Sequence, residues 1–165
     1  MNAVDRFTSA AAAVGLTPDV QRFPEGTRTA ADAAAAVGCA VGQIVKSLVF
    51  SVDGAPILIL TSGANQVDTE LVGARLGARL EKADAAVVRE ATGFAIGGTP
   101  PLGHATPLRT LLDEDLLTHD EVWAAAGTPD TCFPITPDTL LEVTGAEVVA
   151  VQDRGDVSDT SEGAA

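Results

Sequence analysis

The sequence predicts a single α/β or α+β domain built around a mixed sheet. Its 165 residues suit one domain, since domains usually contain roughly 100–200 residues. Short apolar segments of strand character alternate with helical segments, and no internal repeat or interdomain linker separates them. A hairpin signal between two apolar runs adds an antiparallel pair to these strand–helix units, which predicts a mixed sheet.

Turn and capping residues divide the first half of the chain. Gly15 ends an alanine-rich helix, and Asp53-Gly54 is a strong signal for a tight hairpin. Thr29 suits a helix N-cap, and Gly38 has the backbone freedom that a helix end requires. The expected elements are a helix over 2–14, a strand over 19–23, a helix from Thr29 through 37, and strands over 44–52 and 56–61.

The second half continues the alternation of helices and strands. Helices are expected over 68–76 and 83–91, with extended pieces over 78–81 and 93–96 and a Gly/Pro loop over 97–104. Strands over 108–112 and 121–125 flank an acidic connection, and a strand over 131–135 follows. Pro137 suits the first turn of a helix over 137–144, and a strand over 147–151 completes the fold.

The charge balance limits how the protein can bind nucleic acid. Ten lysines and arginines stand against 23 aspartates and glutamates, so the formal charge is −13 and the pI is near 4.3. General nucleic-acid binders are normally basic, because neutralising phosphates supplies most of their affinity. Any nucleic acid must therefore be held locally, by few contacts. Residues 153–165 form an acidic, Gly/Ser/Thr-rich segment that we expect to be a disordered tail after a domain spanning 1–152.

Cysteine use and the apolar runs indicate the compartment. Cys39 and Cys132 are far apart and accompanied by two histidines, which excludes a zinc ribbon and a disulfide scaffold. We expect both to be reduced and buried thiols. Residues 1–8 lack the pattern of a signal peptide, and the apolar run 44–60 is interrupted by charged and turn residues, which excludes a membrane helix. The sequence therefore predicts a cytoplasmic protein.

Lys46 is unusual because it lies inside an apolar strand. With a period of two it shares a face with Ile44, Leu48 and Phe50. A buried ammonium is costly unless it is paired. Packing of the stem with the charged head in water is one explanation, and a cation directed at an anion or polarised carbonyl in a cleft is the other.

The loop from Gly97 to His104 is the second candidate for chemistry. Glycines before a Pro-Pro pair expose backbone N–H groups, while the prolines fix the path of the chain. Such a loop can hold an oxygen anion or a carbonyl, and it can also be a purely structural turn. No Gly-Lys-Ser/Thr follows it, which disfavours a nucleotide triphosphatase.

His104 closes this loop and can either take part in proton transfer or bond to backbone. His119, in an acidic segment, is expected to be solvated. No Gly-x-Ser-x-Gly elbow is present, and a cysteine nucleophile needs a neighbouring base that sequence cannot show. Covalent catalysis is therefore disfavoured.

These features together resemble a known family. The strand Ile-Val-Lys-Ser-Leu-Val-Phe at 44–50, the Gly-Gly-x-Pro-Pro-x-Gly loop at 97–103 and the Thr-Pro-Asp helix start at 136–138, with Thr-Gly-Ala at 144–146, are the motifs concerned. The chain resembles the free-standing YbaK-type aminoacyl-tRNA deacylases, relatives of the editing insertion of bacterial prolyl-tRNA synthetases. The likeness covers roughly residues 2–152.

The resemblance implies a mixed, mostly antiparallel sheet with flanking helices and a cleft for the 3′ end of a misacylated tRNA. The family hydrolyses the ester that joins a wrong amino acid to tRNA, often alanine or cysteine on tRNA for proline. It uses neither a metal nor a cofactor, and attack is thought to be assisted by the substrate. The implied partners are the aminoacyl-tRNA 3′ end, held transiently, and a synthetase as a further candidate; DNA and membranes are not expected.

The resemblance also implies site residues. Lys46, Gly97, Gly98 and His104 are the expected catalytic residues, with Lys46 on a phosphate or ribose oxygen and the glycine N–H groups on the developing oxyanion. The expected substrate-binding residues are Thr99, Pro100, Pro101, Gly103, Arg22, Arg28 and Asp130.

Relatives carry residues that help to select the amino acid where this chain has residues 127–131. We further expect Arg22, Arg28, Lys46 and Arg109 to form a local basic patch. The leading hypothesis is a trans-editing hydrolase acting on tRNA for proline charged with a small wrong amino acid such as alanine. The alternatives are a binding module of the same fold without turnover and a hydrolase for a small ester.

Overall fold

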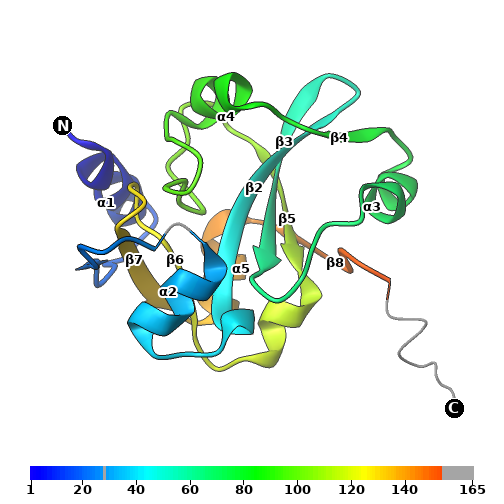
Figure 1. The fold of residues 1–165 in the computed structure, drawn as a ribbon. Helices are drawn as coiled ribbons and strands as arrows, with labels where there is room; N and C mark the ends of the chain where they lie inside the picture. Colours follow the sequence, from blue (N-terminus) through cyan, green and yellow to red (C-terminus); the bar gives the residue numbers. More distant parts are fainter. Residues whose placement is uncertain (28, 154–165) are drawn as a thin grey trace, which may run out of the picture.

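The centre of the structure is a long antiparallel hairpin of β2 (Ile44–Val52) and β3 (Ala55–Ser62) (Figure 1). The structure is a computed structural model that describes residues 1–27 and 29–153. Asp53 and Gly54 connect the two strands, and both have positive φ angles, of 50° and 89°. A two-residue turn with both residues in the left-handed region matches the twist of the paired strands, so the expected hairpin is confirmed.

The described residues form one mixed sheet around this hairpin. Its order is β1-β7-β6-β2-β3-β5-β8, with β4 paired to β2 beside that path. The β2–β6, β3–β5 and β5–β8 pairs are parallel and the other four are antiparallel, so the sheet is mixed and mostly antiparallel as expected. The outer strands are β1 (Gln21–Arg22), β4 (Leu80–Lys82), β5 (Arg109–Asp113), β6 (Val122–Ala125), β7 (Thr131–Ile135) and β8 (Glu147–Val149).

The pairing of β2 is continuous on one edge and interrupted on the other. β3 pairs with β2 along its length, from Val45 to Val52. On the opposite edge β6 pairs only with Ile44 and Val45, and β4 pairs only with Phe50 to Val52. The middle of β2 therefore has an edge that no strand of the described residues covers.

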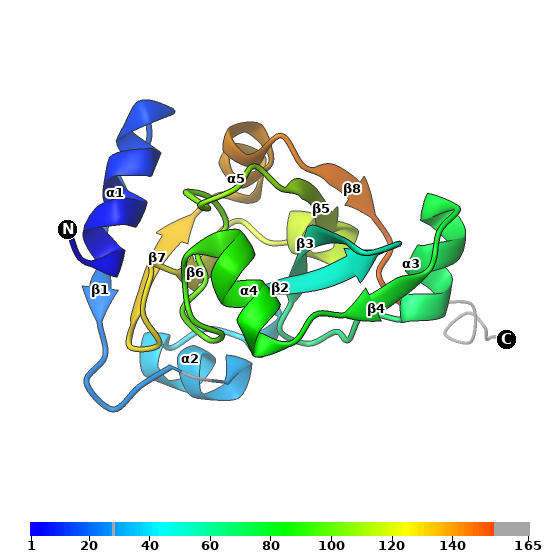
Figure 2. The same ribbon diagram turned by 90° about the horizontal axis from the view of Figure 1, so that it is seen from above.

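Helices cover both faces of the sheet (Figures 1 and 2). One apolar cluster joins Phe7, Val88 and Leu140, from α1, α4 and α5, to the face of β2 that carries Val45 and Val49. The opposite face of the sheet carries two further clusters, to which α2 and α3 contribute. The helices are α1 (Ala3–Ala13), α2 (Ala30–Val37), α3 (Thr69–Leu76), α4 (Ala85–Thr92) and α5 (Pro137–Thr144), with 3₁₀ turns η1 (Val41–Gln43) and η2 (Glu114–Thr118).

Most local expectations hold to within a few residues. Thr29 caps α2 through its hydroxyl, Gly38 ends that helix in the left-handed conformation, and Pro137 begins α5. One expectation is wrong: residues 93–96 are not extended but form bends and a turn, because α4 ends at Gly93 and Gly98 N–H closes a turn onto Ala95 O. The expected tail lies outside the described residues apart from Asp153.

No helix within the described ranges has the length and apolar character that crossing a bilayer requires.

Candidate active site

A cavity of about 520 Å³ lies beside the uncovered edge of β2. Strands β2, β6 and β7 contribute to its walls, together with α2, α4, β4 and the loop after α4. Of the expected catalytic and substrate-binding residues, Lys46, Gly97 and Thr99 line it. Trp123 and Cys132 line it as well, so the cavity brings together segments that are far apart in the chain.

Lys46 is half-buried and its ammonium has a defined partner. Nζ donates a hydrogen bond of 2.6 Å to the backbone oxygen of Asn65. Burial lowers the pKa of Lys46, and the negative charge of Asp113 opposes that shift. An ammonium has three N–H donors, and this is the single hydrogen bond that it makes to the described residues, so two donors remain for a ligand.

Asp113 fixes the loop that holds Lys46. Its side chain is 1% exposed and accepts hydrogen bonds from the backbone N–H of Ser62 and Asp115 and from the side-chain amide of Asn65. The carbonyl that receives the Lys46 ammonium belongs to the same Asn65. A buried carboxylate is tolerated when hydrogen bonds replace its water, so Asp113 positions Lys46 through Asn65.

The loop after α4 is closed at its base by backbone hydrogen bonds. Ala105 N–H donates to Thr92 O, and Thr106 N–H donates to Ala91 O. The Thr92 hydroxyl also accepts from the N–H of Phe94, which is 2% exposed. The loop is thereby attached to the end of α4 at both of its ends.

The glycines of this loop serve different purposes. Gly98 is buried, and a Cβ there would lie 2.8 Å from Thr128 Cα, so the position needs glycine for close backbone approach. Its N–H donates to Ala95 O and is not available to an oxyanion. Gly97 has a φ of 90° and lines the cavity, and its N–H makes no hydrogen bond to the described residues. Gly103 packs against Phe7 and Ala10 of α1, away from the cavity.

His104 lies within the loop and does not line the cavity. Its Nε2 is 2.8 Å from Pro100 O, so the ring supports the loop from inside. Burial lowers the pKa of His104, and the hydrogen bond to Pro100 opposes this shift. Pro100, Pro101 and Gly103 also lie outside the lining, so the site roles expected for these four residues stay predictions.

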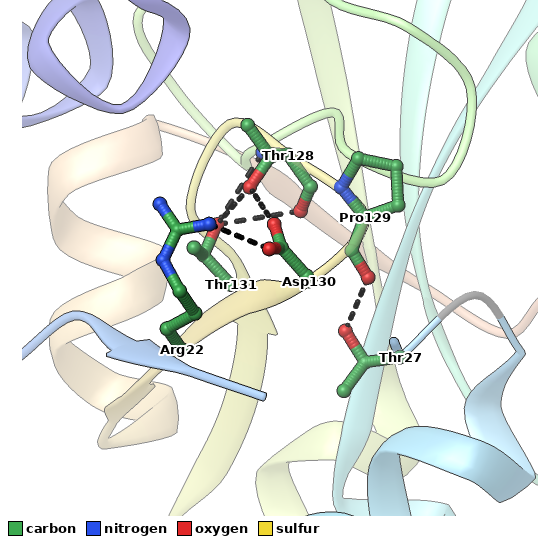
Figure 3. Close-up of polar contacts among 6 residues, drawn as sticks. All are labelled: Arg22, Thr27, Thr128, Pro129, Asp130 and Thr131. Carbon is green, nitrogen blue, oxygen red and sulfur yellow. Dashed lines mark hydrogen bonds and ion pairs between the residues drawn. The ribbon is translucent and has the colours of Figure 1, made fainter. Parts of the chain in front are cut away.

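The turn that carries Asp130 is held by polar contacts with the segment that contains Arg22 and Thr27 (Figure 3). Arg22 and Asp130 form an ion pair of 2.6 Å, and the Thr128 hydroxyl donates to the same carboxylate at 2.6 Å. The pKa of Asp130 is lowered, first by the Thr128 hydroxyl and further by Arg22. Thr27 donates through both its N–H and its hydroxyl to Pro129 O. Asp130 thus joins two segments rather than lining the large cavity.

Among the described residues, Arg22 and Arg109 do not join one basic patch as expected. Arg22 is on β1 and Arg109 on β5, which lie near opposite ends of the sheet order. Arg22 forms an ion pair with Asp130 at 2.6 Å, and Arg109 forms one with Glu147 at 2.9 Å. Arg28 lies outside the described residues. The reason is topological: four strands, β7, β6, β2 and β3, lie between β1 and β5 in the sheet order.

Ser47 and Trp123 line the cavity without having been singled out by the sequence. The Ser47 Oγ is buried and has no hydrogen-bond partner among the described residues. Val49 O accepts from Ala83 N–H on the β4 side, so backbone groups of every second residue, including Ser47, face the uncovered edge. In the sequence, Ser47 is marked only by its neighbour Lys46, a charged residue inside an apolar strand. No sequence signal points to Trp123.

Cys132 lines the cavity as a protonated thiol. Burial raises its pKa to about 11, and a hydrogen bond with Thr27 opposes this shift. The pKa of Cys39 is also raised, by burial and by the charge of Glu121. Because the thiolate is the nucleophilic form, neither cysteine is prepared for covalent catalysis. Within the described part of the chain, no three His, Cys, Asp or Glu side chains gather to hold a metal ion.

Residues 24–143 match the family model of the aminoacyl-tRNA editing domain. The chain belongs to this family. The editing domain found here is 30% identical over 131 residues to the uncharacterized protein YwhH of Bacillus subtilis strain 168, covering 79% of this chain and 83% of that protein. It is 32% identical over 107 residues to a proline–tRNA ligase of Maridesulfovibrio salexigens. This match covers 64% of this chain and 18% of the ligase.

Solved structures agree with this assignment. A crystal structure described as a "putative trans-editing enzyme for prolyl tRNA synthetase" has a TM-score of 0.88 and 47% sequence identity. The match covers 93% of this chain and 98% of that chain. The hypothetical protein APE2540 has a TM-score of 0.80 at 29% identity. The fold expected from the sequence is therefore confirmed over nearly the whole chain.

Replacing Asp113 with alanine should destabilise the editing domain. Three donors lose their acceptor, and hydrogen bonds to charged groups contribute about 1.5–3 kcal/mol, so we expect a loss of that order in the free energy of unfolding. Denaturant titration measures it. Asp120→Ala, at an exposed carboxylate, is the matched control, and equal midpoints for the two variants would contradict the positioning role.

Stability should fall as the pH decreases through the ordinary pKa of histidine, 6.5. The pKa of His104 is lowered in the folded state, so the unfolded chain takes up a proton first and is favoured at lower pH. Denaturant titrations at about pH 7.5 and 5.5 should show a smaller loss for His104→Gln than for the wild type. An identical loss in both proteins would contradict this assignment.

Proposed function

We propose that this editing domain is a trans-editing deacylase that hydrolyses the ester of tRNA for proline carrying a small wrong amino acid. The observation that carries the proposal is the cavity, which places Lys46, Ser47 and Gly97 around one space in a chain that belongs to the editing family. Similarity to a proline–tRNA ligase supports the choice of tRNA. Alanine is the amino acid that we favour.

Hydrolysis of an ester does not require a strong protein nucleophile, because the ester carbonyl is already activated. The protein has to orient the bond, admit water and stabilise the oxyanion that forms. Gly97 N–H is a loop donor at the cavity that makes no hydrogen bond to the described residues, and the remaining N–H donors of Lys46 can bind a phosphate or ribose oxygen. Water attacks the carbonyl carbon, the ester C–O bond breaks, and the ribose oxygen leaves with a proton. A ribose hydroxyl of the substrate assists the attack.

Small side chains on the cavity wall are consistent with a small aminoacyl group. Ala30, Ala33, Ala124 and Ala125 all line it. None of the described lining residues is acidic, so a cationic aminoacyl side chain would find no partner there. The protonated thiol of Cys132 adds a further small, weakly polar surface.

Lys46→Ala should lower the deacylation rate by roughly 10²–10³-fold, the effect of losing one preorganised electrostatic contact. The measurement is hydrolysis of labelled alanyl-, cysteinyl-, seryl-, threonyl- and prolyl-tRNA by wild type and variant in parallel. Arg75→Ala, which removes an exposed cation outside the cavity lining, is the control.

The panel separates the possible functions. Lys46-dependent hydrolysis of one mischarged tRNA supports trans-editing and identifies the amino acid. Binding without hydrolysis would indicate a module that has lost turnover. Activity on aminoacyl esters that does not depend on tRNA would indicate a small-ester hydrolase.

Ser47→Ala should lower activity without lowering stability. The Ser47 hydroxyl is buried and finds no partner in the part of the chain that the structure describes, so removing it costs the folded protein little. A substrate that supplies the partner would lose one hydrogen bond. We expect the rate to fall about 2–10-fold, the equivalent of one neutral hydrogen bond, with an unchanged or higher melting temperature. Ser51→Ala, on the same strand but outside the cavity lining, is the control; a lower melting temperature with an unchanged rate would overturn the assignment.

A further inference from the structure

Lys82 is the second lysine that lines the cavity. The chain contains two lysines, and the structure brings both to one space although 35 residues separate them in sequence. Lys82 pairs with Phe50 in the β4–β2 ladder. Directly paired residues share a face, and Phe50 shares its face with Lys46 by the period of two. The two lysines therefore lie on the same face, roughly 13 Å apart along β2 at about 3.3 Å per residue.

Lys46 and Lys82 differ in exposure and in partners. Lys46 is half-buried and donates to Asn65 O. Lys82 is exposed and forms no ion pair with any described residue. Its neighbour Glu81 pairs with Arg79 and, one residue away on the strand, points to the other face. Lys82 is thus a free cation near the cavity mouth, while Lys46 is the inner one.

The charge of the cavity lining contrasts with that of the protein as a whole. The formal charge is −13, yet no aspartate or glutamate is among the described residues that line the cavity. Arg22, Arg79 and Arg109 are each paired with a carboxylate. The cavity is therefore a local positive site on an acidic molecule, and a site of one sign concentrates ligands of the opposite sign.

We infer that Lys82 binds a phosphodiester of the 3′-terminal nucleotides of the tRNA while the aminoacyl ester lies deeper, beside Lys46. This inference rests on the proposed function. A phosphodiester is the anion that a tRNA 3′ end presents outside the ester, and Lys82 lies outside Lys46 on the same face. Two cations at different depths give the local, low-contact binding that the overall charge demands.

The test compares two substrates that differ in phosphate. Lys82→Ala should raise KM for aminoacyl-tRNA about 10-fold, the effect of one charge-assisted hydrogen bond, and leave kcat unchanged. It should leave hydrolysis of 3′-O-aminoacyl-adenosine, which carries no phosphate, unchanged. The slope of log kcat/KM against log salt concentration should become shallower by about 0.7, the value for one phosphate contact on a single strand. Lys82→Arg should retain most of the affinity.

Arg75→Ala is the matched control, because it removes one exposed cation outside the cavity lining and should change neither substrate's kinetics nor the salt slope. Wild-type kinetics and an unchanged salt slope for Lys82→Ala on aminoacyl-tRNA would overturn the inference and leave the proposed function intact. An equal loss on aminoacyl-adenosine would also overturn it.

A wild type that hydrolyses no aminoacyl-tRNA would instead overturn the proposed function. In that case the Kd of a short RNA ending in CCA still decides the role of Lys82. Weaker and less salt-dependent binding by Lys82→Ala supports the phosphate contact, and equal binding refutes it.

Discussion

The interrupted pairing along one edge of β2 is the constraint on which the site depends. An uncovered strand edge normally invites pairing with another strand. Here β6 and β4 each pair with one end of β2, and the cavity occupies the space between them. The backbone groups of Ser47 that face this gap, and the side chains on either side of it, become accessible to a ligand without any opening of the core.

Two segments held by hydrogen bonds border the gap: the loop after α4 and the turn that contains Thr128. The loop after α4 is held at its base, and Gly98 lets it rest directly on the backbone of Thr128. The turn that contains Thr128 is in turn joined to the segment before α2 by the Arg22–Asp130 ion pair and by Thr27 (Figure 3). An exposed ion pair contributes little stability, so its role is to set the spacing of these segments. Thr131 lines the cavity, and residues 127–130 can thereby influence its shape without lining it.

The position of Lys46 shows how a buried cation is made compatible with the fold. Burial alone lowers its pKa, and the carboxylate of Asp113 opposes that effect from beyond Asn65. Asp113 itself is satisfied by three N–H donors. The ammonium is therefore held by a neutral carbonyl rather than by direct contact with a carboxylate, which leaves its charge available to an anionic ligand.

The sequence by itself determined the elements and the family. Caps, turn residues and the alternation of apolar positions act between near neighbours, so the hairpin at Asp53-Gly54, the helix start at Pro137 and the strand around Lys46 could be predicted. Only the tertiary structure decided which of the candidates share a space. It showed that His104 supports its own loop through a local contact with Pro100. It also paired Arg22 with Asp130 and brought Lys82 to the same cavity as Lys46, because those placements depend on strand pairing between segments that local signals do not connect.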